Sequence, residues 1–268
     1  MPNLKSLAKD TAIYGMSSII GRFLNYLLVP LYTAKMAAST GAYGVITNVY
    51  SYTALLLVLL TFGMETTYFR FATKEGEDAR RVYSTTLIMV GGVSALFVAL
   101  VLTLLHPLSA CMGYADHPEY VGTMAVCVAI DAFQCIPYAH LRQTHRPLKF
   151  AALKLLFISL NIVLNLLYFV AVPLLYDHAA TRPLVSTFYH GELNLAWVFY
   201  INLFCSAFTT LFFRRELTGF RYVFDRRLAG RMWHYAWPIL ALGVAGILNQ
   251  TADKIIFPFV APHVGAGG

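Results

Sequence analysis

A single arginine, Arg22, stands near the centre of an almost wholly apolar run, YGMSSIIGRFLNYLLVPLY, at residues 14–32. If this run is a regular helix that crosses a bilayer, Arg22 lies about 15 Å deep, near the midplane. A charge there costs at least ~2.5 kcal/mol on insertion scales and usually marks a specific interaction. Guanidinium stays charged and can donate two parallel hydrogen bonds to a phosphate. The residue therefore indicates either an anion site or a structural ion pair between helices.

Other polar side chains stand at helical spacing in apolar segments. Asn25 follows the arginine on the same helical face, and Asp131 and Gln134 share a face in a second segment. Asn161 and Asn165 share a face in a third segment, and amides there can bind sugar hydroxyls. Polar residues inside a membrane predict a binding site, but interhelical hydrogen bonds or buried pairs explain them as well.

The segments that carry these residues are expected to be membrane helices. The chain has 268 residues, 58% of them hydrophobic and 12% charged, with a mean hydropathy of +0.62. Soluble domains carry about a quarter charged residues. Seven apolar runs are each long enough to cross about 30 Å of hydrocarbon. They are residues 12–34, 43–64, 82–105, 119–141, 150–176, 194–213 and 233–262. Since no alternation typical of strands competes, we predict an all-α, polytopic membrane protein with about seven transmembrane helices.

The basic residues are unevenly distributed over the connections. Sixteen of the twenty Lys and Arg lie before the first predicted helix or after the second, fourth and sixth, while Lys35 and Arg182 lie on the other side. Because cytoplasmic loops are enriched in basic residues, this predicts a cytoplasmic N-terminus. It also explains the net charge of +7 as topology, without a nucleic-acid partner. The first apolar run lacks a convincing cleavage site, so we expect a retained helix and no signal peptide.

Cysteines and histidines give no sign of a metal centre or a disulfide framework. The histidines in the outer connections are scattered, and no nucleotide-binding G-x-x-x-x-G-K-[ST] motif occurs. We therefore expect no metal and no cofactor. The four cysteines, Cys111, Cys127, Cys135 and Cys205, lack paired spacing. All except Cys111 lie in apolar runs, which is typical of buried small side chains.

The last predicted helix can be aligned with the first at a constant offset of 228 residues. Arg22 then meets Gln250 and Asn25 meets Asp253, so both helices carry polar residues at the same two depths. Six helices separate the two copies, which gives them the same orientation. Parallel repeats of this kind occur in transporters, where the binding site lies between the halves.

This alignment predicts one six-helix transmembrane lobe, residues 1–227, and the first helix of a truncated second lobe, residues 228–268. Asp253 would bind a coupling cation or proton, or pair with a neighbouring basic side chain. The adjacent Lys254 points about 100° away on the helix and can snorkel toward the outer surface.

Two charged residues, Glu65 and Arg70, close the second predicted helix at its cytoplasmic end, within TFGMETTYFRFA. An ion pair of Glu65 would gate the inner mouth of a transport path. A position in the membrane interface, where charges cost little, explains the same residues without a gate.

Four stretches carry a resemblance to a known family: LAKDTAIYGMSSIIGRFLNYLLVPLYT, AYGVITNVYSY, TFGMETTYFRFA and WHYAWPILALGVAGILNQTADKIIF. The sequence resembles the oligosaccharide flippases of the multidrug/oligosaccharidyl-lipid/polysaccharide exporter superfamily, in its polysaccharide-biosynthesis (O-antigen type) branch. The resemblance covers essentially the whole chain and implies a secondary transporter with no enzymatic activity. Such proteins are thought to move polyprenyl-pyrophosphate-linked oligosaccharides across the bacterial inner (cytoplasmic) membrane by alternating access, with membrane lipids around them and glycan polymerases or glycosyltransferases as partners.

The resemblance implies a cationic cavity in which Arg22 faces the pyrophosphate or acidic sugars, driven by Na⁺, H⁺ or substrate flux alone. A cation-coupled multidrug exporter of the same superfamily would favour a carboxylate-rich cavity instead. An integral membrane glycan polymerase would need a large outer loop, and the longest one here has about seventeen residues. The predicted substrate-binding residues are Arg22, Asn25, Asp131, Gln134, Asn161, Asn165, Gln250, Asp253 and Lys254.

Overall fold

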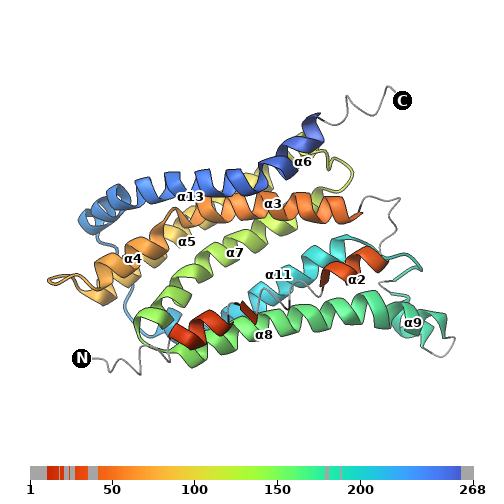
Figure 1. Cartoon of the computed structure of the whole chain (residues 1–268), viewed down its shortest axis with the longest axis horizontal. Coiled ribbons are helices and arrows are strands. Elements are labelled where there is room, and N and C mark those ends of the chain that lie inside the picture. The colour runs from red at the N-terminus through yellow and green to blue at the C-terminus, as the bar shows by residue number, and fades with distance from the viewer. Residues whose placement is uncertain are drawn as a thin grey trace. The chain divides into compact units, whose positions relative to one another are not determined.

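The computed structural model describes residues 11–17, 19, 20, 24, 28–35, 42–178, 181–187 and 189–260, with the backbone alone at residues 42 and 252–260. These residues form helices and loops and include no strand, which confirms the all-α class. The chain divides into two compact units. Unit 1 comprises residues 1–43 and 145–212, and unit 2 comprises residues 44–144 and 213–268. Figure 1 shows the helices along the chain, coloured by residue number.

Four helical stretches of the described chain are long and apolar enough to cross a membrane: Tyr43–Ala72, Ala79–Thr103, Pro118–Gln143 and Pro147–Asp177. They agree with the second to fifth predicted spans, so this is a multi-pass membrane protein. A shorter apolar helix, Ala196–Leu211, matches the sixth. The first predicted span lies partly outside the described residues. As membrane spans, the first, sixth and seventh stay predictions, and so does the division at residue 227.

Unit 1 is built around one long helical stretch with a wider turn inside it. Pro173 has no N–H to donate to the carbonyl of Phe169, and there the chain makes a π-helical turn, in which the Val172 N–H bonds to the Leu167 carbonyl. Helix α11 packs along α8, and the short α2 also contacts α8. The elements are α2 (Leu28–Lys35), α8 (Pro147–Leu166), η2 (Leu167–Ala171), α9 (Val172–Asp177), α10 (Arg182–Val185) and α11 (Ala196–Leu211).

Unit 2 contains the closely packed pair α5 and α7. Helix α4 packs on both of them, and α13 packs on α4 and α5 (Figure 1). The elements are α3 (Ala42–Thr61), α4 (Met64–Ala72), α5 (Ala79–Thr103), α6 (Leu105–Cys111), α7 (Pro118–Gln143), α12 (Arg214–Thr218) and α13 (Arg226–Val260). Helix α13 begins seven residues before the predicted start at 233, because Asp225 caps it with bonds to two backbone N–H groups, those of Arg227 and Leu228.

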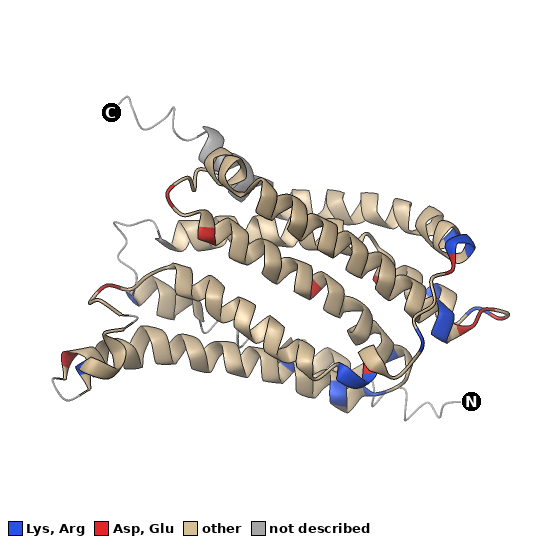
Figure 2. Cartoon of the chain, turned by 180° about the vertical axis from the view of Figure 1, so that it is seen from behind, with Lys and Arg blue, Asp and Glu red and all other residues tan. Residues whose placement is uncertain are grey.

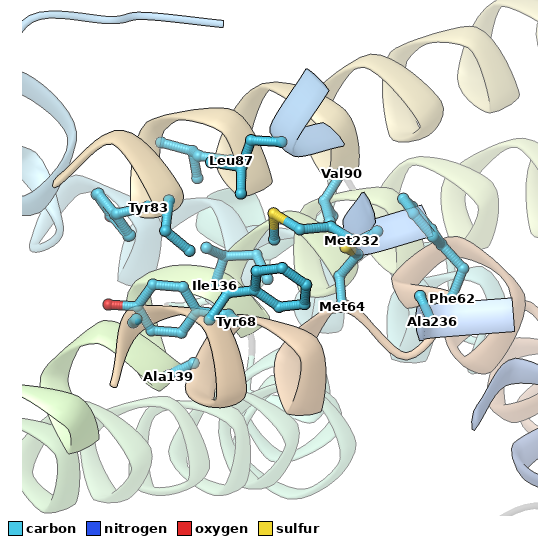
Figure 3. Close-up of a cluster of buried hydrophobic side chains, with 14 residues drawn as sticks. Phe62, Met64, Tyr68, Tyr83, Leu87, Val90, Ile136, Ala139, Met232 and Ala236 are labelled. Carbon is cyan, nitrogen blue, oxygen red and sulfur yellow. The ribbon is translucent and has the colours of Figure 1, made fainter. Parts of the chain in front are cut away.

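The hydrophobic core of unit 2 lies where α4, α5, α7 and α13 meet (Figure 3). Tyr68 from α4, Leu87 from α5, Ile136 from α7 and Met232 from α13 converge there, each at most 2% exposed. The first turns of α13 are therefore an integral part of this unit.

A break separates α3 from α4. Phe62 and Gly63 adopt positive φ angles of 35° and 69°, and the helix then resumes to Ala72. The predicted end at residue 64 was therefore wrong. The reason is amphipathicity: Met64, Tyr68 and Phe71 recur at helical spacing and are buried, which holds this charged segment in a helix.

Candidate functional site

Two predicted site residues, Asn161 and Asn165 on α8, form a buried hydrogen-bonded cluster in unit 1. The Tyr32 hydroxyl donates to Asn165 Oδ1 over 2.8 Å, and Asn165 Nδ2 donates to the Asn161 carbonyl, also over 2.8 Å. Asn165 is 0% exposed, and the Tyr32 ring packs edge-on against Phe169 in the π-helical turn. The Cys205 thiol on α11 is a further partner of Asn161. The cluster ties α2, α8 and α11 together inside the apolar part of the unit.

This cluster defines what the two amides can do chemically. Amide and phenol groups can exchange hydrogen bonds with sugar hydroxyls without any change of charge. In this arrangement, however, the Asn165 side-chain oxygen already accepts a hydrogen bond from Tyr32, and its nitrogen donates to Asn161. A sugar would have to displace one of these bonds, so assignment to substrate binding stays a prediction.

A second pair of predicted residues lies on α7 in unit 2. Gln134 is buried and Asp131 is half-buried, one turn apart. Tyr138, a further turn along the same face, is buried with its ring edge-on to Phe213 at 4.8 Å. The shared polar face expected from the sequence is therefore present on this helix.

The charged residues Glu65 and Arg70 lie on α4, and each has a defined contact. Arg142 at the end of α7 forms an ion pair with Glu65, and its guanidinium also lies 5.2 Å from the centre of the Phe69 ring. Arg70 lies over the Tyr235 ring of α13 at 4.5 Å. Glu65 is thus paired with Arg142, while its role as a gate stays a prediction.

The described Lys and Arg residues of unit 2 gather at the end where α4, α7 and α13 meet, whereas residues 82–141 contain no Lys or Arg (Figure 2). Two more ion pairs hold α13 there. Arg231 Nη1 donates to Glu77 Oε1 over 2.5 Å, and Arg81 lies 3.6 Å from Asp225. The Leu228 N–H, then that of Arg227, lowers the pKa of Asp225 below its ordinary 3.8, with Arg81 and Arg231 adding to the shift.

Sequence reasoning missed a buried polar cluster beside these pairs. The Tyr68 hydroxyl is hydrogen bonded to His140 Nδ1 at 2.9 Å, and the Tyr83 ring lies 4.3 Å from the His140 ring. The Tyr83 hydroxyl donates to the Glu216 carbonyl, which docks α12 on α5. The sequence signal that could have found this cluster is the helical spacing of Tyr68 and Phe71, three residues apart in TTYFRF.

The remaining predicted residues give less information. Arg22 and Asn25 lie outside the described residues. Gln250 is exposed on α13, and Asp253 and Lys254 are helical positions whose side chains are not described. The matched pairs of the proposed repeat therefore stay predictions.

Metal-ligating residues are scattered over the described part of the chain. In that part, no group of three or more His, Cys, Asp or Glu side chains could hold a metal ion. Two of the free cysteines, Cys127 and Cys205, are buried as expected, whereas Cys111 is exposed and Cys135 is half-buried.

These features define a class: a multi-pass, all-helical membrane protein with buried polar groups inside apolar helices and a basic cluster at one end of unit 2. Residues 7–268 match the family model described as polysaccharide biosynthesis protein. The chain belongs to this family, and its role lies in polysaccharide biosynthesis or export at a membrane. No curated protein and no solved structure matches the chain.

Proposed function

We propose that this protein flips polyprenyl-pyrophosphate-linked oligosaccharides across the bacterial cytoplasmic membrane by alternating access. The observation that carries this proposal is the family match over residues 7–268 together with four membrane-spanning helices. A polysaccharide made on a lipid carrier must pass its polar head group through hydrocarbon, and only a polar path between helices lowers that barrier.

The described polar residues support such a path. Asn161 and Asn165 in unit 1, and Gln134 in unit 2, are buried in membrane-spanning helices yet carry neutral amides. Neutral amides can bind sugar hydroxyls with little electrostatic cost. The charge needed for the pyrophosphate is assigned to Arg22, since a guanidinium binds phosphate oxygens in pairs.

In this proposal the N-terminus is cytoplasmic, and the protein performs no covalent chemistry and uses no cofactor. A Na⁺ or H⁺ gradient, or the flux of substrate itself, drives transport. Glycosyltransferases supply the lipid-linked glycan on the inner face, and a glycan polymerase receives it on the outer face.

Restoration of surface glycan tests the function. The full-length protein is expressed in a bacterial strain that lacks its own flippase, and surface glycan is quantified at matched membrane abundance. We expect rescue by the natural protein, loss of rescue in Arg22→Ala, and partial rescue in Arg22→Lys. Arg80→Ala, which removes an exposed arginine at the start of α5, is the matched control and should retain full rescue.

Two outcomes would contradict the proposal in different ways. Rescue by Arg22→Ala equal to that of the natural protein would reduce Arg22 to a structural role. Failure of the natural protein to rescue, combined with efflux of a cationic dye from the same cells, would instead identify a multidrug exporter.

A further inference from the structure

An apolar cavity of about 210 Å³ lies inside unit 2, between α3 and the helices α5, α6 and α7. Its walls include Val49 of α3, Phe97 and Val101 of α5, Met112 after α6, and Met124 of α7. Three of the four helices belong to stretches that are long and apolar enough to cross a membrane. The cavity therefore lies among apolar helices, toward one end of these stretches.

Helix α3 is held at both ends of this cavity. At the end near α4, Leu60 packs against Val128 and Ala132 of α7. At the other end, the Tyr114 hydroxyl donates to Asn48 Oδ1 over 2.7 Å. These two contacts lie on either side of the cavity. The cavity therefore does not depend on the rotamer of a single side chain.

Water is a poor occupant of this space. A buried water needs two to four polar partners, and all described lining side chains except Tyr52 and Thr53 are apolar. The Thr53 hydroxyl already donates to the Val49 carbonyl over 2.9 Å. A dry, empty gap would leave its walls without dispersion contacts. An apolar occupant needs no polar partner and provides the walls with dispersion contacts.

We propose that the cavity holds part of one acyl chain of a bilayer phospholipid, which packs between α3 and the helices α5 and α7. Side chains at its border, including Leu56, Phe97 and Leu108, are only half-buried, so the hydrocarbon of the bilayer has access to it. Phospholipid chains surround every membrane helix at high local concentration, which makes them the resident occupant. This inference does not depend on the proposed transport function.

Photo-crosslinking tests the site. The full-length protein is reconstituted in vesicles that contain phosphatidylglycerol with a diazirine in the middle of one acyl chain, and labelled residues are mapped by mass spectrometry. We expect labels on Phe97, Met112 or Met124 in the cavity, besides the unavoidable labels on lipid-facing positions such as the exposed Leu96.

A variant that fills the cavity provides the specific readout. Ala125→Phe places a ring in the space, because Ala125 is 4% exposed and lines the cavity. Labelling of cavity residues should fall about five-fold or more, since a filled interior excludes the chain. Ala99→Phe adds the same ring on the exposed face of α5 and should leave cavity labelling unchanged. If Ala125→Phe fails to fold, as judged by gel filtration, Ala125→Leu takes its place.

Each result decides the proposal. Cavity labelling that is lost in Ala125→Phe or Ala125→Leu, but not in Ala99→Phe, supports an acyl chain. Labelling confined to lipid-facing residues, or cavity labelling that the filling variants leave intact, overturns it. Excess unlabelled polyprenyl phosphate that removes cavity labelling would assign the site to the polyprenyl tail and overturn the phospholipid assignment.

Discussion

Replacement of Gly63 by alanine should strongly destabilise unit 2. Gly63 has φ 69°, and the left-handed conformation costs a residue with a Cβ about 1–2 kcal/mol. An added Cβ would also lie 2.9 Å from Cγ2 of Ile239 and 3.2 Å from the carbonyl oxygen of Ala236, both on α13. A backbone carbonyl cannot rotate away, so α13 must shift, and overpacking of this kind costs about 1–3 kcal/mol. The expected total is about 2–5 kcal/mol.

Thermal unfolding in detergent measures this loss. For a chain of this size, each kcal/mol shifts Tm by about 2–4 °C, so Gly63→Ala should melt roughly 4–20 °C lower than the natural protein. Trp233 reports the local change, because its ring lies 5.4 Å from the Phe62 ring beside the break. A shift of its emission in the folded state is expected together with the lower Tm.

A second glycine is the matched control. Gly92 lies in the middle of α5, and a Cβ added there would meet no atom within 4 Å. Gly92→Ala should therefore raise stability by up to about 1 kcal/mol, because alanine loses less entropy in a helix. If Gly63→Ala melted as high as Gly92→Ala with unchanged tryptophan emission, the close approach of α13 to the break would be refuted.

Four further substitutions probe the polar contacts. Asn165→Leu removes the acceptor of the Tyr32 hydroxyl and should cost about 0.6–2 kcal/mol, whereas Tyr32→Phe should cost about 0.6 kcal/mol or less, both measured by melting in detergent. Glu65→Gln should cost less than about 1 kcal/mol and reduce the salt dependence of Tm, because the side chains of the pair with Arg142 are 32% and 41% exposed. The lowered pKa of Asp225 gives stability that is present above pH 3.8 and is lost as the pH falls through the folded-state pKa. Hydrogen-exchange protection of the first turn of α13, corrected for intrinsic rates, should therefore drop below that pH, and Asp225→Asn should remove the transition.

The membrane spans could be predicted from the sequence because their signal is local. Long apolar runs identify α5, α7 and the stretch from α8 to α9, and the prolines at positions 118 and 147 begin two of them at the first helical turn. The break at Phe62 could not be predicted in the same way. A phenylalanine with positive φ is disfavoured locally and persists because the surrounding core, including α13, fixes it.

The tertiary contacts of the candidate site could not be predicted from local sequence patterns either. Sequence periodicity placed Asn161 and Asn165 on one face, and they do share a cluster, but Tyr32, which donates to Asn165, comes from a helix far away in the sequence. Likewise, the spacing of Glu65 and Arg70 suggested a charged helix end, whereas Glu65 pairs with Arg142. Periodicity assigns a residue to a face, and tertiary packing decides which element that face meets.

The energetics of α13 limit where the proposed alternating-access movement could occur. Its first turns are held by half-exposed ion pairs, each contributing about 0–1 kcal/mol, which a transport cycle could break with ease. The same turns also bury Leu228 and Met232, both at most 1% exposed, and loss of one such side chain from a core typically costs about 2–5 kcal/mol. The buried contacts therefore dominate, and we expect the first turns of α13 to stay packed on α4 and α5. A transport movement compatible with this core leaves the first turns of α13 in place and must use other parts of the chain.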